Sequence, residues 1–69
     1  MSEKILNKII SLRTEKKLTQ EQLATAVGVT RQTIIAVEKG KYIPSLNLAF
    51  KLSLFFNTSI EEIFTYEKN

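Results

Sequence analysis

The sequence predicts a single all-α domain built from five short helices. Its apolar residues recur three or four positions apart along most of the 69 residues, which is the spacing of helices that share one core. The two glycines and the single proline lie where apolar stripes stop, and almost no segment is left for strands. A chain of this length has room for one domain. We expect residues 1–69 to form it, with residues 65–69 as a short tail.

The first helix is expected from about Glu3 to Lys16. Its apolar stripe consists of Leu6, Ile9, Ile10 and Leu12. Ser2 precedes this stripe and is a candidate N-cap. The second helix is expected from about Gln20 to Val27, because Thr19 and Gln22 have the spacing of a capping box that fixes its start.

A sharp turn at Gly28 separates the second helix from the third. Glycine adopts the left-handed conformation of such a turn without steric cost. Val29 is expected to fill the turn from the core side, and Thr30 is a candidate N-cap for a third helix from about Arg31 to Lys39. The stripes on the two sides of the turn face one core and consist of Leu23, Ala24, Val27, Ile34 and Val37.

The segment Gly40–Pro44 cannot continue the third helix. Glycine favours a helix end, and proline keeps the preceding Ile43 out of the helical region. Ser45 is then a candidate cap for a fourth helix from about Leu46 to Phe56. The apolar stripe of this helix consists of Leu48, Ala49, Leu52, Phe55 and Phe56.

A fifth, short helix is expected to end near Phe64. The pair Asn57-Thr58 interrupts the fourth helix, and Ser59 and Glu62 then have the spacing of a second capping box. The remaining residues show no periodic pattern, so the prediction for the C-terminal end is an irregular tail.

Two short helices joined by a sharp turn, as between Gln20 and Glu38, have the layout of a helix-turn-helix unit. From about Ile9 to Phe64 the sequence resembles the Cro and phage-repressor family of helix-turn-helix proteins, in particular its small stand-alone bacterial transcriptional regulators. The blocks that carry the resemblance are Leu12-Arg13, then Leu18-Thr19-Gln20-x-x-Leu23-Ala24, then Gly28-Val29-Thr30-Arg31-x-Thr33-Ile34, then Glu38-x-Gly40-Lys41-x-x-Pro44-Ser45-Leu46. It implies a five-helix, lambda-repressor-like domain that binds double-stranded DNA and regulates transcription, expected to be a repressor.

The exposed first turn of the third helix is the expected base-reading surface. An arginine can form two hydrogen bonds with guanine, and a glutamine two with adenine. The resemblance places base reading at Arg31, Gln32, Thr33 and Ala36. Relatives often carry a longer polar side chain at the place of Ala36, so more of the recognition here would depend on DNA shape. Ile35 either contacts a thymine methyl group or packs against the fourth helix. A polar helix face without a ligand is the plainer alternative.

Backbone phosphates are expected to bind on both sides of that helix tip. Gln20 opens the second helix, where free backbone N–H groups attract anions. The full set of candidate phosphate contacts is Gln20, Thr30, Lys39, Lys41, Tyr42 and Ser45. Relatives usually have asparagine at the place of Lys39, although a cation also suits a phosphate. Such contacts give salt-sensitive affinity without sequence information.

The resemblance also implies an ion pair between Arg13 and Glu38, which would join the first helix to the end of the third. The alternative is two unrelated surface charges that contribute less than about 1 kcal/mol. If the pair is buried, removing Arg13 alone should cost about 3–5 kcal/mol, because Glu38 would lose its partner.

The charge distribution separates a basic body from an acidic C-terminal end. Residues 1–51 carry nine basic and four acidic side chains, residues 52–69 one basic and three acidic, and the net charge is +3. We expect DNA on the basic side and a second copy at the acidic end, since one recognition helix reads few base pairs. A twofold homodimer implies a palindromic operator. The candidate interface consists of Phe56, Ile60, Phe64 and Tyr66. Core burial explains some of the aromatic residues at this end equally well.

The composition excludes several other classes of function. Without cysteine or histidine the chain lacks thiolates and imidazoles, so no metal site, no cofactor and no enzyme activity are expected. There is no room for a ligand-sensing domain, so no small-molecule effector site is expected. No apolar run approaches the ~20 residues of a membrane span, and no signal peptide is evident. We therefore expect a cytoplasmic protein without membrane contact. The remaining alternative is an antitoxin-like protein-interaction module with the same fold.

Overall fold

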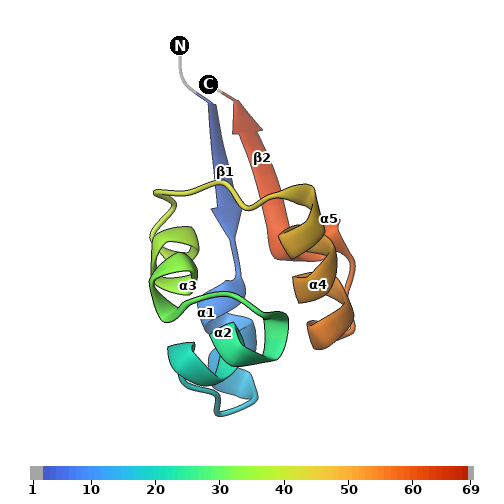
Figure 1. Cartoon of the computed structure of the whole chain (residues 1–69). Helices are drawn as coiled ribbons and strands as arrows, with labels where there is room; N and C mark the ends of the chain where they lie inside the picture. Colours follow the sequence, from blue (N-terminus) through green and yellow to red (C-terminus); the bar gives the residue numbers. More distant parts are fainter. Residues whose placement is uncertain (1–2, 69) are drawn as a thin grey trace.

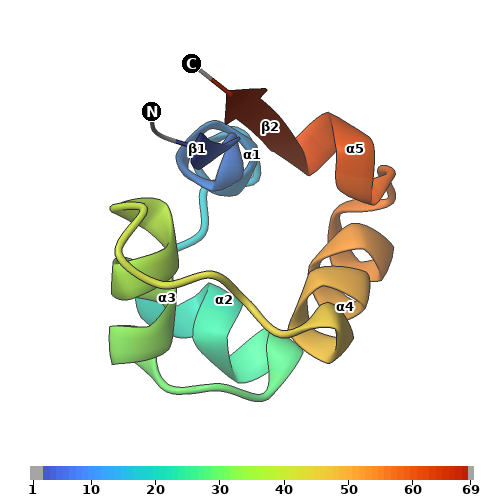
Figure 2. The same ribbon diagram turned by 90° about the horizontal axis from the view of Figure 1, so that it is seen from above.

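The computed structural model describes residues 3–68, which form five helices around one core and a two-stranded ribbon that extends away from them (Figure 1). The elements in order are β1 (Glu3–Asn7), α1 (Ile9–Glu15), α2 (Gln20–Val27), α3 (Arg31–Glu38), α4 (Leu46–Phe56), α5 (Ile60–Ile63) and β2 (Phe64–Lys68). Seen from above, α3 and α4 lie on opposite sides of the molecule, and the segment that joins them crosses between (Figure 2). Within the described residues, no helix has the length and hydropathy to traverse a bilayer.

The predicted first helix, Glu3–Lys16, is wrong in its N-terminal half. Its first residues form β1, and only Ile9–Glu15 is helical. Lys8 separates the two elements and is the N-cap of α1, without a side-chain cap hydrogen bond of its own. The Oδ1 of Asn7, the last residue of β1, accepts a hydrogen bond from the backbone N–H of Ile9 at 3.1 Å. The candidate cap Ser2 lies outside the described residues.

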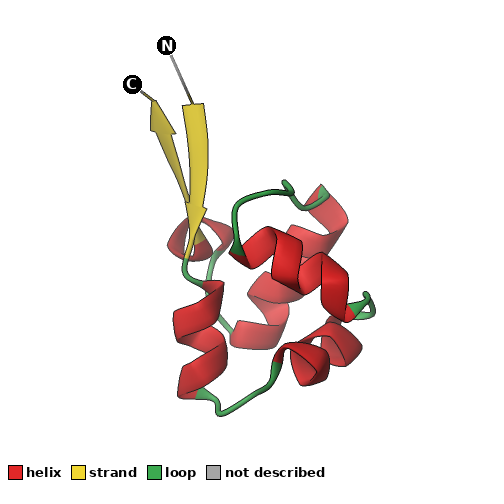
Figure 3. Ribbon diagram, turned by 90° about the vertical axis from the view of Figure 1, so that its left-hand side faces the viewer, coloured by secondary structure: helices red, strands yellow, loops and turns green. Residues whose placement is uncertain are grey.

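The all-α prediction is also corrected by the C-terminal segment, which forms β2 instead of an irregular tail. β2 pairs antiparallel with β1, with Ile5 opposite Tyr66 and Lys4 opposite Glu67. An aliphatic residue opposite an aromatic one, and opposite charges across the ladder, are pairs that stabilise strands. The strands project beyond the helices (Figure 3). The fold is therefore mostly helical with a small sheet.

The other helix boundaries follow the caps that the sequence predicts. Thr19 and Ser59 each form a complete capping box, and the side chains of Thr30 and Ser45 accept backbone hydrogen bonds at the starts of α3 and α4. The helices α2 and α4 have the predicted bounds, and α3 ends one residue early, at Glu38. In the second box, hydrogen bonds from the Thr58 hydroxyl and from Ser59 hold the pKa of the Glu62 carboxyl below its ordinary value.

The core joins all five helices. Its buried members are Ile9, Leu23, Ala24, Val27, Ile34, Val37, Leu48, Leu52, Phe56 and Ile63. The apolar stripes predicted on both sides of Gly28 are all buried, and Val29 packs against the cluster as expected. By contrast, Leu6 and Ile10, which belonged to the predicted first stripe, are exposed. Leu6 lies on β1 rather than on a helix face, whereas Ile10 lies on α1 beside the buried Ile9.

Lys17 offers a direct test of backbone strain. It follows the C-cap of α1 with φ +58°, a left-handed conformation that costs a residue with a side chain roughly 1–2 kcal/mol. Glycine avoids that cost but gains entropy in the unfolded chain, so we expect Lys17→Gly to raise the free energy of unfolding by about 0.5–1 kcal/mol. Urea denaturation at fixed protein concentration measures the change.

Lys16→Gly is the matched control, because it makes the same change of composition and charge at a residue whose φ is −88°. This control should lower stability. Equal effects of the two substitutions would contradict the strain argument.

Candidate nucleic-acid interface

The helix-turn-helix unit consists of α2, the turn at residues 28–30, and α3. Gly28 has φ +76°, and the backbone N–H of Val29 donates to the carbonyl of Ala24 at 2.9 Å, which closes the end of α2. Thr30 then starts α3, its hydroxyl accepting from the N–H of Thr33 at 3.3 Å. The turn is thus fixed by backbone geometry at one end and by a side-chain cap at the other.

The N-terminal turn of α3 presents the predicted base-reading residues at the surface. Arg31 and Gln32 are exposed, and Thr33 and Ala36 are partly exposed. The hydroxyls of Thr30 and Thr33 lie 3.1 Å apart and form a hydrogen bond with each other, although both residues are predicted to contact DNA. Ile35 is partly exposed and is not among the residues of the core cluster. The long polar side chains free to reach a ligand from this tip are therefore Arg31 and Gln32.

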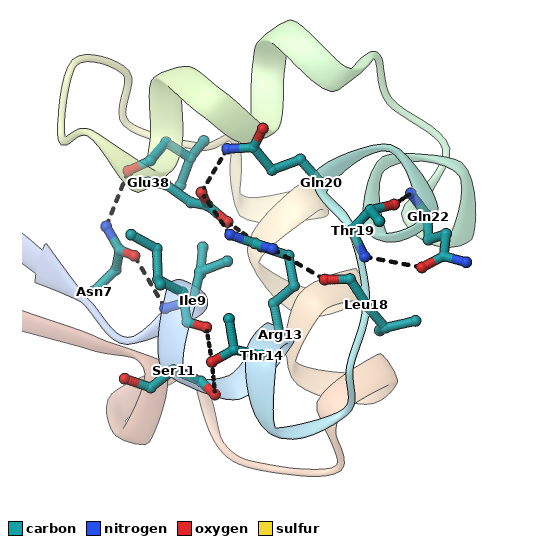
Figure 4. Close-up of polar contacts among 12 residues, drawn as sticks. Asn7, Ile9, Ser11, Arg13, Thr14, Leu18, Thr19, Gln20, Gln22 and Glu38 are labelled. Carbon is teal, nitrogen blue, oxygen red and sulfur yellow. Dashed lines mark hydrogen bonds and ion pairs between the residues drawn. The ribbon is translucent and has the colours of Figure 1, made fainter.

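Three helices meet at the carboxylate of Glu38 (Figure 4). Arg13 Nε on α1 donates to Glu38 Oε2 at 2.7 Å, and Gln20 Nε2 on α2 donates to Oε1 at 3.0 Å. Arg13 also donates to the carbonyl of Leu18 at 2.9 Å. Only 14% of the Arg13 side chain and 3% of the Glu38 side chain are exposed. This nearly buried network sets the position of α3 against α1 and α2.

Gln20 therefore has a role that the sequence does not reveal. It stands first in α2, where it was predicted to bind a phosphate, but its side-chain amide is engaged by Glu38. A phosphate at this helix start would contact backbone N–H groups, which every helix N-terminus leaves without intrahelical acceptors.

The connection between α3 and α4 carries the other predicted phosphate contacts. Lys39, Lys41, Tyr42 and Ser45 are all exposed. Gly40 has φ +72° and allows the backbone to reverse, with the N–H of Lys41 donating to the carbonyl of Ala36 at 2.9 Å. A second link at this end of α3 comes from Asn7, whose Nδ2 donates to the carbonyl of Val37 at 2.9 Å. These contacts hold the connection against the C-terminal end of α3.

An apolar hollow of about 290 Å³ lies next to this connection. Its lining comes from β1, the α3–α4 connection, α4, α5 and β2. We call its main residues the apolar face, and they are Ile5, Ile43, Pro44, Leu46, Ile60 and Phe64. Tyr66, which is 60% exposed, lies opposite Ile5 in the sheet and extends this face.

The predicted dimer residues divide between this face and the core. Ile60, Phe64 and Tyr66 lie on the apolar face or beside it. Phe56 is 7% exposed and belongs to the core cluster, so it offers almost no surface to a second chain. Leu46 is 70% exposed and is not among the predicted interface residues. One sequence signal indicates its exposure: Leu46 directly follows the cap Ser45 and lies outside the apolar stripe of α4.

The helix-turn-helix family model matches residues 9–63 of the chain. An uncharacterized HTH-type transcriptional regulator of Methanocaldococcus jannaschii is 61% identical over 61 residues, which is 88% of this chain and 92% of that protein. The cryptic phage CTXphi transcriptional repressor RstR of Vibrio cholerae is 40% identical over 57 residues, which is 83% of this chain and 51% of that protein.

A solved structure has the same helical arrangement. It is the crystal structure of the restriction-modification controller protein C.AhdI from Aeromonas hydrophila, with a TM-score of 0.72 and 35% sequence identity. The match covers 78% of this chain and 82% of that chain.

Proposed function

Because this chain belongs to the helix-turn-helix family of transcriptional regulators, which are DNA-binding proteins and not enzymes, we propose that it is a cytoplasmic repressor that binds a palindromic operator as a homodimer. In this proposal α3 enters the major groove, and residues 1–69 act as one domain. Arg31, Gln32, Thr33 and Ala36 face the base edges. Backbone phosphates are bound by Thr30, Lys39, Lys41, Tyr42, Ser45 and the start of α2.

The observation that carries this proposal is the exposed tip of α3 on a fixed support. Arg31 and Gln32 are the residue types that bind guanine and adenine with two hydrogen bonds each. Their helix cannot turn freely, because Glu38 at its other end is held by Arg13 and Gln20. Because α3 is held rigidly, the two side chains can be kept opposite the same base pairs of the major groove, and sequence-specific recognition requires this.

The apolar face supports the dimer. Exposed apolar side chains that gather in one place mark interaction sites, and Ile43, Leu46 and Tyr66 of this face are 56%, 70% and 60% exposed. This face adjoins the α3–α4 connection, so a second copy seated on it would bring its own phosphate-binding connection and recognition helix to the same side. Twofold pairing on DNA places the two α3 helices about 34 Å apart, which is one turn of the duplex.

Selection of bound sequences from random duplex DNA tests the proposal. We expect a symmetric motif, and we expect Arg31→Ala or Gln32→Ala to weaken binding to it by about 1–3 kcal/mol per half-site. The same substitutions should change affinity for unrelated DNA much less, because base contacts carry the discrimination. Fluorescence anisotropy at several salt concentrations measures both affinities.

Lys4→Ala is the control, since it removes one positive charge from the outer end of β1, which points away from the helices (Figure 3). It should leave the selected motif and its affinity unchanged. Weak and equal binding to all sequences would contradict the proposal and favour the antitoxin-like alternative, in which the apolar face holds a different protein.

A further inference from the structure

A polar groove lies between the helix-turn-helix turn and the start of α4. Its volume is about 240 Å³, and it is formed by the end of α2, the turn, α3, the α3–α4 connection and α4. The polar side chains that line it are Thr33, Tyr42, Ser45, Asn47 and Lys51. Three of these five belong to the predicted DNA contacts, and the groove is therefore continuous with the proposed interface. Asn47 and Lys51 also line the groove but are not among the predicted DNA contacts.

Lys51 is well suited to bind an anion in this groove. Its Nζ lies 3.8 Å from the position that a Cβ would take at Gly28, so the ammonium group sits beside the turn. Within residues 3–68, the salt bridge of the structure is Arg13–Glu38, and Lys51 has no acidic partner. No carboxylate lines the groove either. The site therefore combines an uncompensated cation with the amide of Asn47 and the phenol of Tyr42 as hydrogen-bond donors.

We propose that Lys51 and Asn47 bind a backbone phosphate of the DNA strand that passes the helix-turn-helix turn. The ligand is a phosphodiester because the donors surround an open groove at the edge of the recognition helix, where a duplex in the proposed pose brings its backbone. This inference rests on the proposed DNA binding and adds one phosphate contact per protomer. Such a contact raises affinity for every sequence alike and makes it more sensitive to salt.

Lys51→Gln tests the contact by fluorescence anisotropy with the selected operator and with an unrelated duplex. The slope of log affinity against log salt concentration should fall by about 0.9 for each protomer, and affinity near 0.15 M salt should fall about fivefold per protomer, equally for both duplexes. Lys51→Arg keeps the charge and should retain the slope. Lys4→Gln, the matched loss of charge on β1, should leave the slope unchanged.

Asn47→Asp separates binding from folding. Residue 47 lies in the first turn of α4, where a negative charge stabilises the helix, but in the groove the same charge repels a phosphate. We expect a higher melting temperature together with weaker DNA binding. Neutral methylphosphonate linkages in the DNA opposite the turn should weaken binding by the wild-type protein. They should not weaken binding by the Lys51→Gln variant further, because that variant has already lost the same contact.

The inference is overturned if Lys51→Gln and Lys4→Gln have the same salt slope, or if the methylphosphonates affect wild type and Lys51→Gln alike. Binding of inorganic phosphate at Lys51, followed by NMR shifts, together with an unchanged DNA salt slope would assign the groove to free anions and also overturn it. If the wild-type chain binds no DNA at all, the proposed function itself fails, which is a different result from a wild-type chain that binds DNA without using Lys51.

Discussion

Arg13→Ala should lower the free energy of unfolding by about 3–5 kcal/mol, because it leaves the nearly buried Glu38 carboxylate without its cationic partner. Gln20 would remain as a donor to Oε1, but an amide does not neutralise the charge. Arg13 also satisfies the carbonyl of Leu18, which would lose that hydrogen bond. Domains of ordinary stability unfold at a cost of about 5–15 kcal/mol, and a small one lies near the lower end. The variant should therefore retain at most about 2 kcal/mol of stability and be partly unfolded at 37 °C.

Urea denaturation at one fixed protein concentration measures this loss, since a dimer's apparent stability depends on concentration. Lys16→Ala is the control: it removes an exposed cation just after the same helix and should change stability by less than about 0.5 kcal/mol. A double variant, Arg13→Met with Glu38→Leu, should recover much of the lost stability, because no buried charge is left unpaired. A fully stable Arg13→Ala variant would show that the pair contributes little to folding.

Local signals predicted the helices well. The caps at Thr19 and Ser45 act within four residues of chain, and the helices that follow them begin and end where the sequence placed them. The strands were missed for the opposite reason. Residues 3–7 form β1 only because residues 64–68 pair with them, and no short-range pattern reports a partner about 60 residues away. The spacing of Leu6 and Ile9 fits a helix equally well.

The candidate site shows the same division. The start of α3 depends on the cap at Thr30 and the turn at Gly28, so local sequence patterns suffice to predict that Arg31 and Gln32 lie at the surface. The pairing of Arg13 with Glu38 came from the family resemblance, and the hydrogen bond from Gln20 to Glu38 was not foreseen, because it depends on how three helices converge. The apolar face and the groove at Lys51 likewise gather residues from distant segments.

The apolar face is the most informative place to test whether two copies of the chain form a dimer. Leu46 and Leu54 are both exposed leucines on α4, at 70% and 80%. Leu46 lines the apolar face, whereas Leu54 lies at the other end of the helix beside Lys51 and Phe55. A second copy seated on the apolar face would cover the first leucine and not the second. The two positions therefore form a matched pair in residue type, helix and exposure.

We expect Leu46→Lys to convert the proposed dimer to a monomer and to weaken operator binding by about 10²–10⁴-fold, because each half-site is then bound without a linked partner. The added positive charge alone would favour DNA, so a loss of affinity cannot come from electrostatics. Leu54→Lys adds the same charge and should remain dimeric, with undiminished operator affinity. Ile43→Lys, in the loop of the same face, should behave like Leu46→Lys without altering a helix.

Sedimentation equilibrium gives the oligomeric state, circular dichroism shows that each variant is folded, and anisotropy gives the operator affinity. A Leu46→Lys variant that stays dimeric would place the interface elsewhere. One that is monomeric and still binds the full operator with wild-type affinity would show that recognition needs no dimer. Either result would contradict the proposed arrangement, in which the α3–α4 connection binds phosphates and the adjoining apolar face binds the second copy.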